Sequence, residues 1–237
     1  MNRTAELAAE YRAASNREAF LRARSGLPGA RANLELLSVA AASSVPAELD
    51  RWAARSPTDA PENTPDVFVV CVGVAGQGFI VARGDRAPLP RLRAFANDPR
   101  WRVRESVAIG LQAWGDVDVP ALLDEMERWA TGTPLEGRAA MAAICEPRLL
   151  RRREDVTRVL AILDTLTAAV RDAPKPTSPD VRVLRQALGY GWSVAVAADP
   201  EIGLPAFDRW SADVNADVRW IVNENRKKSR LTRLLPV

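Results

Sequence analysis

An internal repeat constrains the fold of this chain more than any other feature of its 237 residues. Three segments, 89–104, 123–138 and 204–219, align without gaps. Each carries a large aromatic residue near its middle and ends on an arginine: Phe95 and Arg104, Trp129 and Arg138, Trp210 and Arg219. A degenerate fourth copy keeps only its end, Asp180-Val181-Arg182. The four arginines lie 34, 44 and 37 residues apart (104 to 138, 138 to 182, 182 to 219), which is typical of stacked helix pairs.

The register of the repeat predicts alternating first and second helices. We expect first helices over about 89–97, 119–131, 155–172 and 203–212. The second helices are expected near 67–83, 100–113, 135–146, 180–195 and 216–230. Pro90, Pro120 and Pro205 fall where the first turn of a helix tolerates a missing N–H. Asp180 and Asp217 are the expected N-caps of their helices.

The segment 67–82 is almost continuously apolar, and its pattern alone fits a buried strand as well as a buried helix. The order Gly84-Asp85 followed by Leu89-Pro90 recurs as Gly115-Asp116 followed by Val119-Pro120. This correspondence places 67–83 in the position of a second helix, so we expect a helix whose glycines permit close packing. The apolar run is short for a membrane span, and we expect no membrane partner.

The first third of the chain carries no clear copy of the repeat. It predicts a helix over about 4–24 that breaks near Ser15, then short helices over 33–42 and 46–54. Ser15-Asn16-Arg17-Glu18 has the form of a capping box. A turn at 26–29 and a proline-containing loop at 56–65 separate these helices. We therefore expect an irregular helical cap over 1–66, followed by repeats over 67–237.

The repeat resembles that of the HEAT-like proteins, a family of α-solenoids. The resemblance is sharpest at Asp98 to Arg104 and at Asp217 to Asn225, where an Asp precedes an Arg at the start of the second helix. It implies an all-α fold, a right-handed α-α superhelix of about five to six antiparallel helix pairs. It also implies that second helices line a concave face, and that Arg104, Arg138, Arg182 and Arg219 are first of all packing residues.

Composition narrows the chemistry that this chain can perform. The sequence contains no histidine, which excludes Ser-His-Asp and Cys-His catalysis and most zinc sites. We expect neither a metal nor a cofactor. Cys71 and Cys145 each lie in an apolar stretch, so we expect two buried free thiols and a reducing, cytoplasmic location. The net charge of +3 does not by itself indicate a nucleic-acid partner.

Two tryptophans are candidates for binding rather than packing. Trp101 lies three residues before Arg104, and Trp220 lies one residue after Arg219, which puts both rings on one face of the second helix. A ring beside an arginine on that face suits stacking against a ligand, although packing of adjacent repeats explains it too. The full set of binding candidates adds Arg182 and the basic cluster Arg226, Lys227, Lys228 and Arg230, which equally suits the solvated end of a last helix.

The leading hypothesis is a non-enzymatic binding or scaffold protein that uses a concave helical face for a protein or nucleic-acid partner. The alternative follows from one HEAT-like subfamily, the DNA alkylation repeat glycosylases. In that subfamily a carboxylate and tryptophan faces stabilise the charge on a departing alkylated base. Trp114 and Asp118 are loosely similar to such a site, with Trp192 as its second wall. The alternative therefore predicts a DNA-binding glycosylase-like protein.

Overall fold

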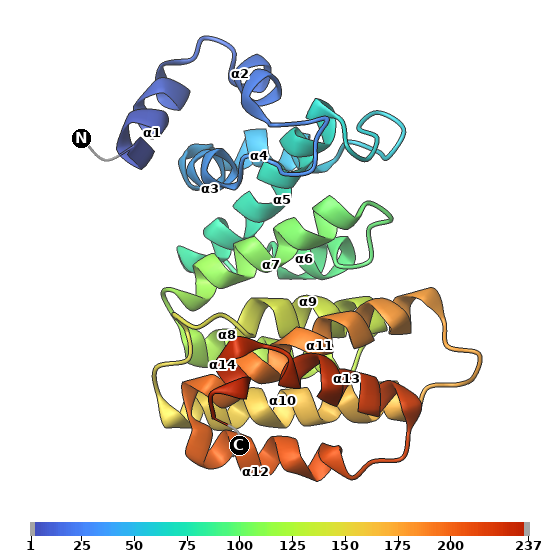
Figure 1. Cartoon of the computed structure of the whole chain (residues 1–237). Helices are drawn as coiled ribbons and strands as arrows, with labels where there is room; N and C mark the ends of the chain where they lie inside the picture. The colour runs from blue at the N-terminus through green and yellow to red at the C-terminus, as the bar shows by residue number, and fades with distance from the viewer. Residues whose placement is uncertain (1–2, 235–237) are drawn as a thin grey trace. The chain divides into compact units, whose positions relative to one another are not determined.

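A computed structural model describes residues 3–234, which form fourteen α-helices and no strands (Figure 1). The chain divides into two compact units, one up to Trp114 and one from Gly115 onward. The prediction of an all-α protein is confirmed. The sequence analysis divided the chain by the presence of the repeat, into a cap over 1–66 and repeats over 67–237, and that division stays a prediction.

The N-terminal unit is built around one buried helix. Its helices are α1 (Arg3–Ala13), α2 (Arg17–Arg24), α3 (Leu34–Ser43), α4 (Pro46–Ala53), α5 (Pro65–Ala82), α6 (Leu89–Phe95) and α7 (Trp101–Gly115). Helices α2, α3, α4 and α6 all pack against α5. The break expected near Ser15 and the short helices expected before residue 55 are confirmed.

Helix α5 settles the ambiguity of the apolar segment, because the whole stretch is helical. The Thr64 hydroxyl caps it by accepting the backbone N–H of Val67, and Pro65 occupies the first turn, where no N–H is needed. Fourteen of its eighteen residues are buried. By length and composition alone this helix could also cross a membrane, so the expectation that the apolar run is short for a span is wrong. Its burial inside the unit is that of a core helix.

Close packing of α5 depends on a glycine pair. Gly78 of α5 faces Gly110 of α7 so closely that a Cβ added to Gly78 would lie 2.1 Å from the Gly110 carbonyl carbon. A Cβ on Gly110 would in turn lie 2.7 Å from the Ala75 oxygen. The two backbones therefore touch, and no larger residue fits between them.

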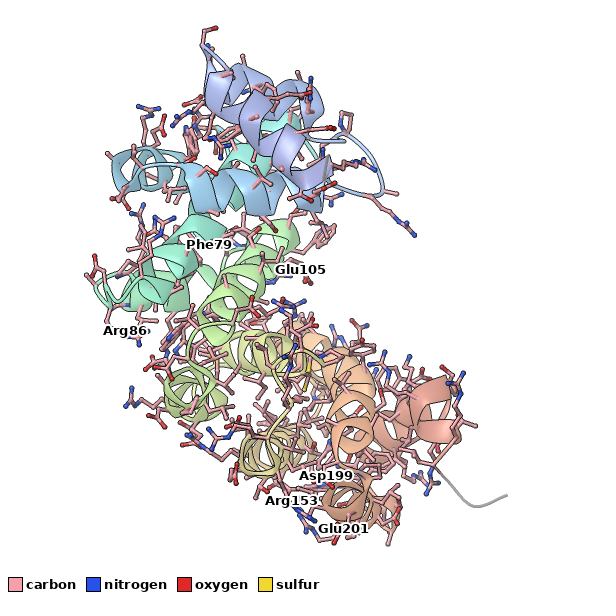
Figure 2. The ribbon with its side chains drawn as sticks, turned by 90° about the vertical axis from the view of Figure 1, so that its left-hand side faces the viewer. Phe79, Arg86, Glu105, Arg153, Asp199 and Glu201 are labelled. Carbon is pink, nitrogen blue, oxygen red and sulfur yellow. The ribbon has the colours of Figure 1, made fainter. Side chains whose placement is uncertain are left out.

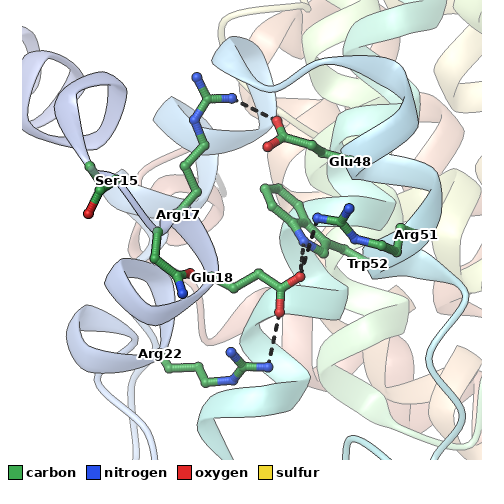
Figure 3. Close-up of a pocket in the computed structure, with 9 residues that line it drawn as sticks. Ser15, Arg17, Glu18, Arg22, Glu48, Arg51 and Trp52 are labelled. Carbon is green, nitrogen blue, oxygen red and sulfur yellow. Dashed lines mark hydrogen bonds and ion pairs between the residues drawn. The ribbon is translucent and has the colours of Figure 1, made fainter.

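Glu18 joins α2 to α4 and does not complete a capping box with Ser15. Asn16 caps α2 instead, accepting from the Ala19 N–H at 3.0 Å. The Glu18 carboxylate accepts Trp52 Nε1 at 2.8 Å and Arg22 Nη2 at 3.1 Å (Figure 3), and it also accepts an N–H of the Arg55 guanidinium. Burial opposes the charge on this carboxylate, but the hydrogen bonds from Arg55 and Trp52 outweigh it and lower the pKa of Glu18. The polar contacts of Glu18 therefore connect helices of this unit to one another.

The C-terminal unit contains α8 (Val119–Ala130), α9 (Pro134–Ile144), α10 (Arg153–Arg171), α11 (Pro179–Ala198), α12 (Pro200–Ser211), α13 (Ala216–Arg226) and α14 (Ser229–Thr232). Consecutive helices pack as the pairs α8–α9, α10–α11 and α12–α13. First helices also contact first helices, α8 with α10 and α10 with α12. Second helices contact second helices, α9 with α11 and α11 with α13 (Figure 1).

Local expectations in this unit are wrong at α11, α12 and α13. Pro205 lies inside α12, because the helix starts earlier, at Pro200. The helix expected over 216–230 ends at Arg226, and extended backbone at Lys228 separates α13 from the short α14. Asp180 lies in the first turn of α11, whereas Ser178 is the cap and accepts from the Val181 N–H.

We predict that Gly78→Ala destabilises the protein by about 1–3 kcal/mol, because the added methyl group meets immovable backbone. Gly137→Ala, in α9, is the matched control: its Cβ would meet only the end of the Leu166 side chain, which can rotate. Both changes gain helix propensity of about 1 kcal/mol, so the difference between them isolates the clash. Urea unfolding measures both, and an unchanged or stabilised Gly78→Ala protein would contradict the packing described.

Candidate functional site

Trp220, a sequence candidate, lies on α13 against α11. The guanidinium of Arg185, from α11, lies over its ring, 4.6 Å from the centroid. Gly189 leaves room for the ring, since a Cβ there would be 2.9 Å from the indole Cζ3 atom. The half-buried indole is therefore held in one orientation by α11, with a cation on its face.

Asp217 holds that arginine in place. It is 8% exposed and accepts Arg185 Nη1 at 2.5 Å and the Lys175 ammonium. The expected cap is wrong here: Asn215 caps α13, accepting the backbone N–H groups of Asp217 and Val218 at 2.9 and 3.3 Å. The hydrogen bond from Lys175 lowers the pKa of Asp217, burial opposes this, and the bond from Arg185 adds to the lowering.

Tyr190 of α11 forms a second aromatic–arginine pair, with Arg230 of α14. Tyr190 directly follows Gly189, and it is 43% exposed. The guanidinium of Arg230 lies 4.7 Å from its centroid and donates to the phenol oxygen at 3.0 Å. Arg185, Tyr190, Trp220 and Arg230 together define what we call the α11–α13–α14 surface. Trp220 and Arg230 were expected from the sequence, whereas Arg185 and Tyr190 lie outside the repeat pattern and carried no signal.

The repeat arginines differ from one another in their contacts. Arg104 donates to the carbonyls of Asp98 and Pro99 at 2.7 and 3.0 Å, and Arg182 donates to that of Thr177. Both therefore hold the backbone that precedes their helix, which fits the packing role implied by the resemblance. Arg219 is exposed on α13, and Arg138 is half-buried.

The basic clusters are largely engaged with neighbouring groups. Arg226 donates to the Ser211 hydroxyl at 3.1 Å, Lys227 pairs with Glu224 at 2.5 Å, and Lys228 precedes α14. A second basic cluster consists of Arg151, Arg152 and Arg153, and two of these arginines form ion pairs. Arg153 pairs with Asp199 at 3.5 Å and Glu201 at 3.0 Å, and the three side chains lie together in Figure 2. Lys227, Arg152 and Arg153 are therefore compensated by carboxylates, whereas the partner of Arg226 is a neutral hydroxyl.

Trp101 belongs to the N-terminal unit, at the start of α7, and is 46% exposed. The cation on its ring is Arg102, at 4.3 Å from the centroid, and not the expected Arg104. The ring lies at the edge of a largely apolar pocket of about 530 Å³. The expectation of an accessible tryptophan beside an arginine fits this placement, with a different arginine.

Both tryptophans of the glycosylase alternative are buried, and its carboxylate caps a helix. Asp118 is the N-cap of α8 and accepts the Ala121 N–H at 3.0 Å. Trp192 is fully buried, donates to the Thr167 hydroxyl at 3.0 Å and lies against Phe207. Trp114 is 3% exposed, with the guanidinium of Arg86 on its ring. Neither indole offers a face to a base.

The aromatic repeat position is mainly a packing position. Trp129 is fully buried and donates to Glu125 at 2.8 Å. Trp210 and Phe95 are half-buried, and Trp210 donates to Asp164 at 2.7 Å. The structure thus places the three equivalent rings at different depths, with a carboxylate holding each of the two indoles.

The cysteines and the acidic groups offer no further chemistry. Cys71 and Cys145 are buried and free, as expected. Burial raises the pKa of Cys71 to about 12, against a smaller opposite effect of the hydrogen bond with Ser106, and burial also raises the pKa of Cys145. Both thiols are therefore protonated at neutral pH and poor nucleophiles. Within residues 3–234 no group of three His, Cys, Asp or Glu side chains is arranged to hold a metal ion.

No protein-family model matches this chain, and no curated protein or solved structure is significantly similar to it. The HEAT-like resemblance therefore depends on the repeat residues alone, and any function has to be argued from the surfaces described above.

We predict that Asp217→Asn destabilises the protein at pH 7 by about 1–2 kcal/mol, a value that allows for the solvent exposure of Lys175. Because the folded-state pKa of Asp217 is lowered, its ionised form stabilises the fold above about pH 4, and this contribution disappears as the pH falls through the folded-state pKa. The difference between wild type and variant in urea unfolding should therefore shrink below pH 4.

The control is Asp180→Asn, which removes an exposed carboxylate from the first turn of α11. It should cost less than Asp217→Asn at pH 7, because only the helix dipole favours that charge. Equal losses for the two variants, or a pH-independent loss for Asp217→Asn, would show that the ion pairs do not stabilise the fold.

Proposed function

We propose that this chain is a non-enzymatic binding or scaffold protein with a HEAT-like, right-handed solenoid architecture, and that its α11–α13–α14 surface binds a protein partner. The packing of α9, α11 and α13 in series supports the architecture, because second helices contact second helices in such a solenoid. The surface lies on two of these second helices and the short helix that follows them.

The pair of rings Tyr190 and Trp220, each under a guanidinium, is the observation that carries this proposal. Tryptophan, tyrosine and arginine are the residues enriched at the energetic centres of protein interfaces. Both rings are ordered before binding, Trp220 by α11 and Tyr190 by Arg230, so less side-chain entropy is lost on association. A partner with carboxylates and apolar side chains would complement this surface.

The pairing of cations favours a protein over a nucleic acid. Lys175 and Arg185 share the carboxylate of Asp217, and Lys227 pairs with Glu224. A nucleic-acid groove needs cations that follow the phosphate backbone and release counterions on binding. The basic residues near α13 are more simply the solvated end of the helical array.

The glycosylase alternative has weaker support. It requires a carboxylate near the sugar and exposed indole faces for the cationic base. Asp118 caps α8, and Trp192 is sealed in the core of the C-terminal unit. We expect no release of methylated purines above background by the wild-type protein, and no effect of Asp118→Asn. Clear release that is lost on Asp118→Asn would favour the alternative.

Site-specific photo-crosslinking tests the proposed interface. A benzophenone amino acid replacing Tyr190 should give one discrete adduct with a protein of the native cell. The same probe at Val214, which is 88% exposed in the same unit, is the control and should give none. Arg185→Ser should reduce the adduct, because Trp220 then loses the cation on its ring. Adducts from both positions, or from neither, would contradict the interface.

A salt titration tests the nucleic-acid hypothesis on the same surface. We expect no binding of duplex DNA by fluorescence anisotropy at physiological salt. If DNA binds, the slope of log affinity against log salt should be compared with that of the variant in which Arg226, Lys227, Lys228 and Arg230 are all Gln. Binding with a steep salt dependence that the variant flattens would overturn the protein-partner proposal.

A further inference from the structure

The pocket beside Trp101 is enclosed by the N-terminal unit alone. It lies between the loop at 27–32 and the helices α3, α5 and α7, and its volume is about 530 Å³. Its floor includes Phe68 and Cys71, which are almost completely buried, and Leu34 stands 57% exposed among its lining residues. Glu105, also in the lining, marks this part of α7 in Figure 2. An occupant would therefore reach from the surface to the core.

Arg102 gives this apolar pocket a polar end. Its side chain lines the pocket although the residue is only 8% exposed. Nη2 donates to the Gly29 carbonyl at 2.8 Å and to Asn63 Oδ1 at 3.2 Å, which fixes the guanidinium. Nε is buried and has no hydrogen-bond partner among the described residues; Glu62 Oε1 is 3.4 Å away, an ion pair without a hydrogen bond. A buried N–H group without an acceptor costs free energy, so the binding of a ligand that supplies an acceptor is favoured.

The charged residues of the lining are Arg31, Arg102 and Glu105, and Arg102 is in addition paired with Glu62. The Cys71 thiol on the floor is protonated, because burial raises its pKa to about 12. The interior is thus apolar and neutral, and the exposed Arg31 adds a cation at its edge.

We propose that this pocket binds a free small molecule that has an apolar chain and a carboxylate, with the chain against Phe68 and Leu37 and the carboxylate near Arg102. This site goes beyond the proposed function, because it lies in the other unit and needs no protein partner. Its volume is that of small-molecule sites, which are mostly apolar with a few placed polar groups. Trp101, under the Arg102 guanidinium, forms part of the rim.

Titration with decanoate, followed by calorimetry, tests this proposal on the whole chain. Decanol is the matched ligand without the charge. We expect decanoate to bind at least about tenfold more tightly than decanol, since a hydrogen bond to a charged group contributes that much. Equal affinities for the two ligands would show an apolar pocket without carboxylate recognition, which overturns the proposal. No binding of either would overturn it as well.

A pair of variants at Leu34 separates the head-group charge from the apolar wall. Leu34→Lys and Leu34→Glu remove the same side chain from an exposed position, so both should fold. A glutamate at the pocket lining repels a carboxylate and a lysine attracts it, and we expect decanoate to bind about tenfold more weakly to Leu34→Glu than to Leu34→Lys. Decanol should not distinguish them. Equal decanoate affinities of the two variants would contradict binding in this pocket.

Arg102→Met provides the direct test of the head-group contact. It should lower decanoate affinity to about that of decanol, because the charged donor is lost. Thermal unfolding shows whether the variant folds, since Arg102 also holds Gly29 and Asn63. If it is unfolded, the Leu34 pair decides the question. A folded Arg102→Met protein with unchanged decanoate affinity would overturn the proposal.

Discussion

Helix α5 can be buried on every side only because its backbone lets other backbones touch it. Gly78 admits Gly110 of α7, and α2, α3, α4 and α6 pack around the rest of the helix. A helix that is apolar on all sides has to be covered completely, and these five shorter helices can cover it only at very small separations. In the C-terminal unit α11 plays the same part, with α9, α10, α12, α13 and α14 in contact with it. Each unit therefore depends on one central helix.

Several arginines of the chain hold loops and neighbouring carboxylates of the fold itself. Arg100, which is 4% exposed, donates to the carbonyls of Arg55, Ser56 and Ala60 and so fixes the loop that leads into α5. Arg102 reaches the loop at Gly29. A guanidinium can satisfy several carbonyls at once, which suits loops whose backbone lacks helical partners. The basic composition thus reflects loop fixation and local ion pairs more than a surface for phosphate.

The sequence predicted the helices well, because apolar periodicity and proline positions depend on local chemistry. The helical state of α5 was predictable only through the register of the repeat. The contacts of the candidate binding residues were harder to predict from the sequence. Helix geometry puts Arg104 beside Trp101, but Arg104 turns back to the Asp98 and Pro99 carbonyls, and Arg102 covers the ring because Gly29 and Asn63 hold it there. Contacts between residues 39 and 73 positions apart leave no trace in a local pattern.

Trp101 and Trp220 show the same arrangement in the two units, a partly exposed indole with a guanidinium on its ring. In both cases the arginine is held by groups outside its own helix turn, Arg102 by the loop at Gly29 and Arg185 by Asp217 of α13. An exposed indole left mobile would lose rotamer freedom on binding, whereas a ring already stacked on a fixed cation loses little. Ordering the ring before binding is therefore one contribution that the arginine makes at each of these two tryptophans.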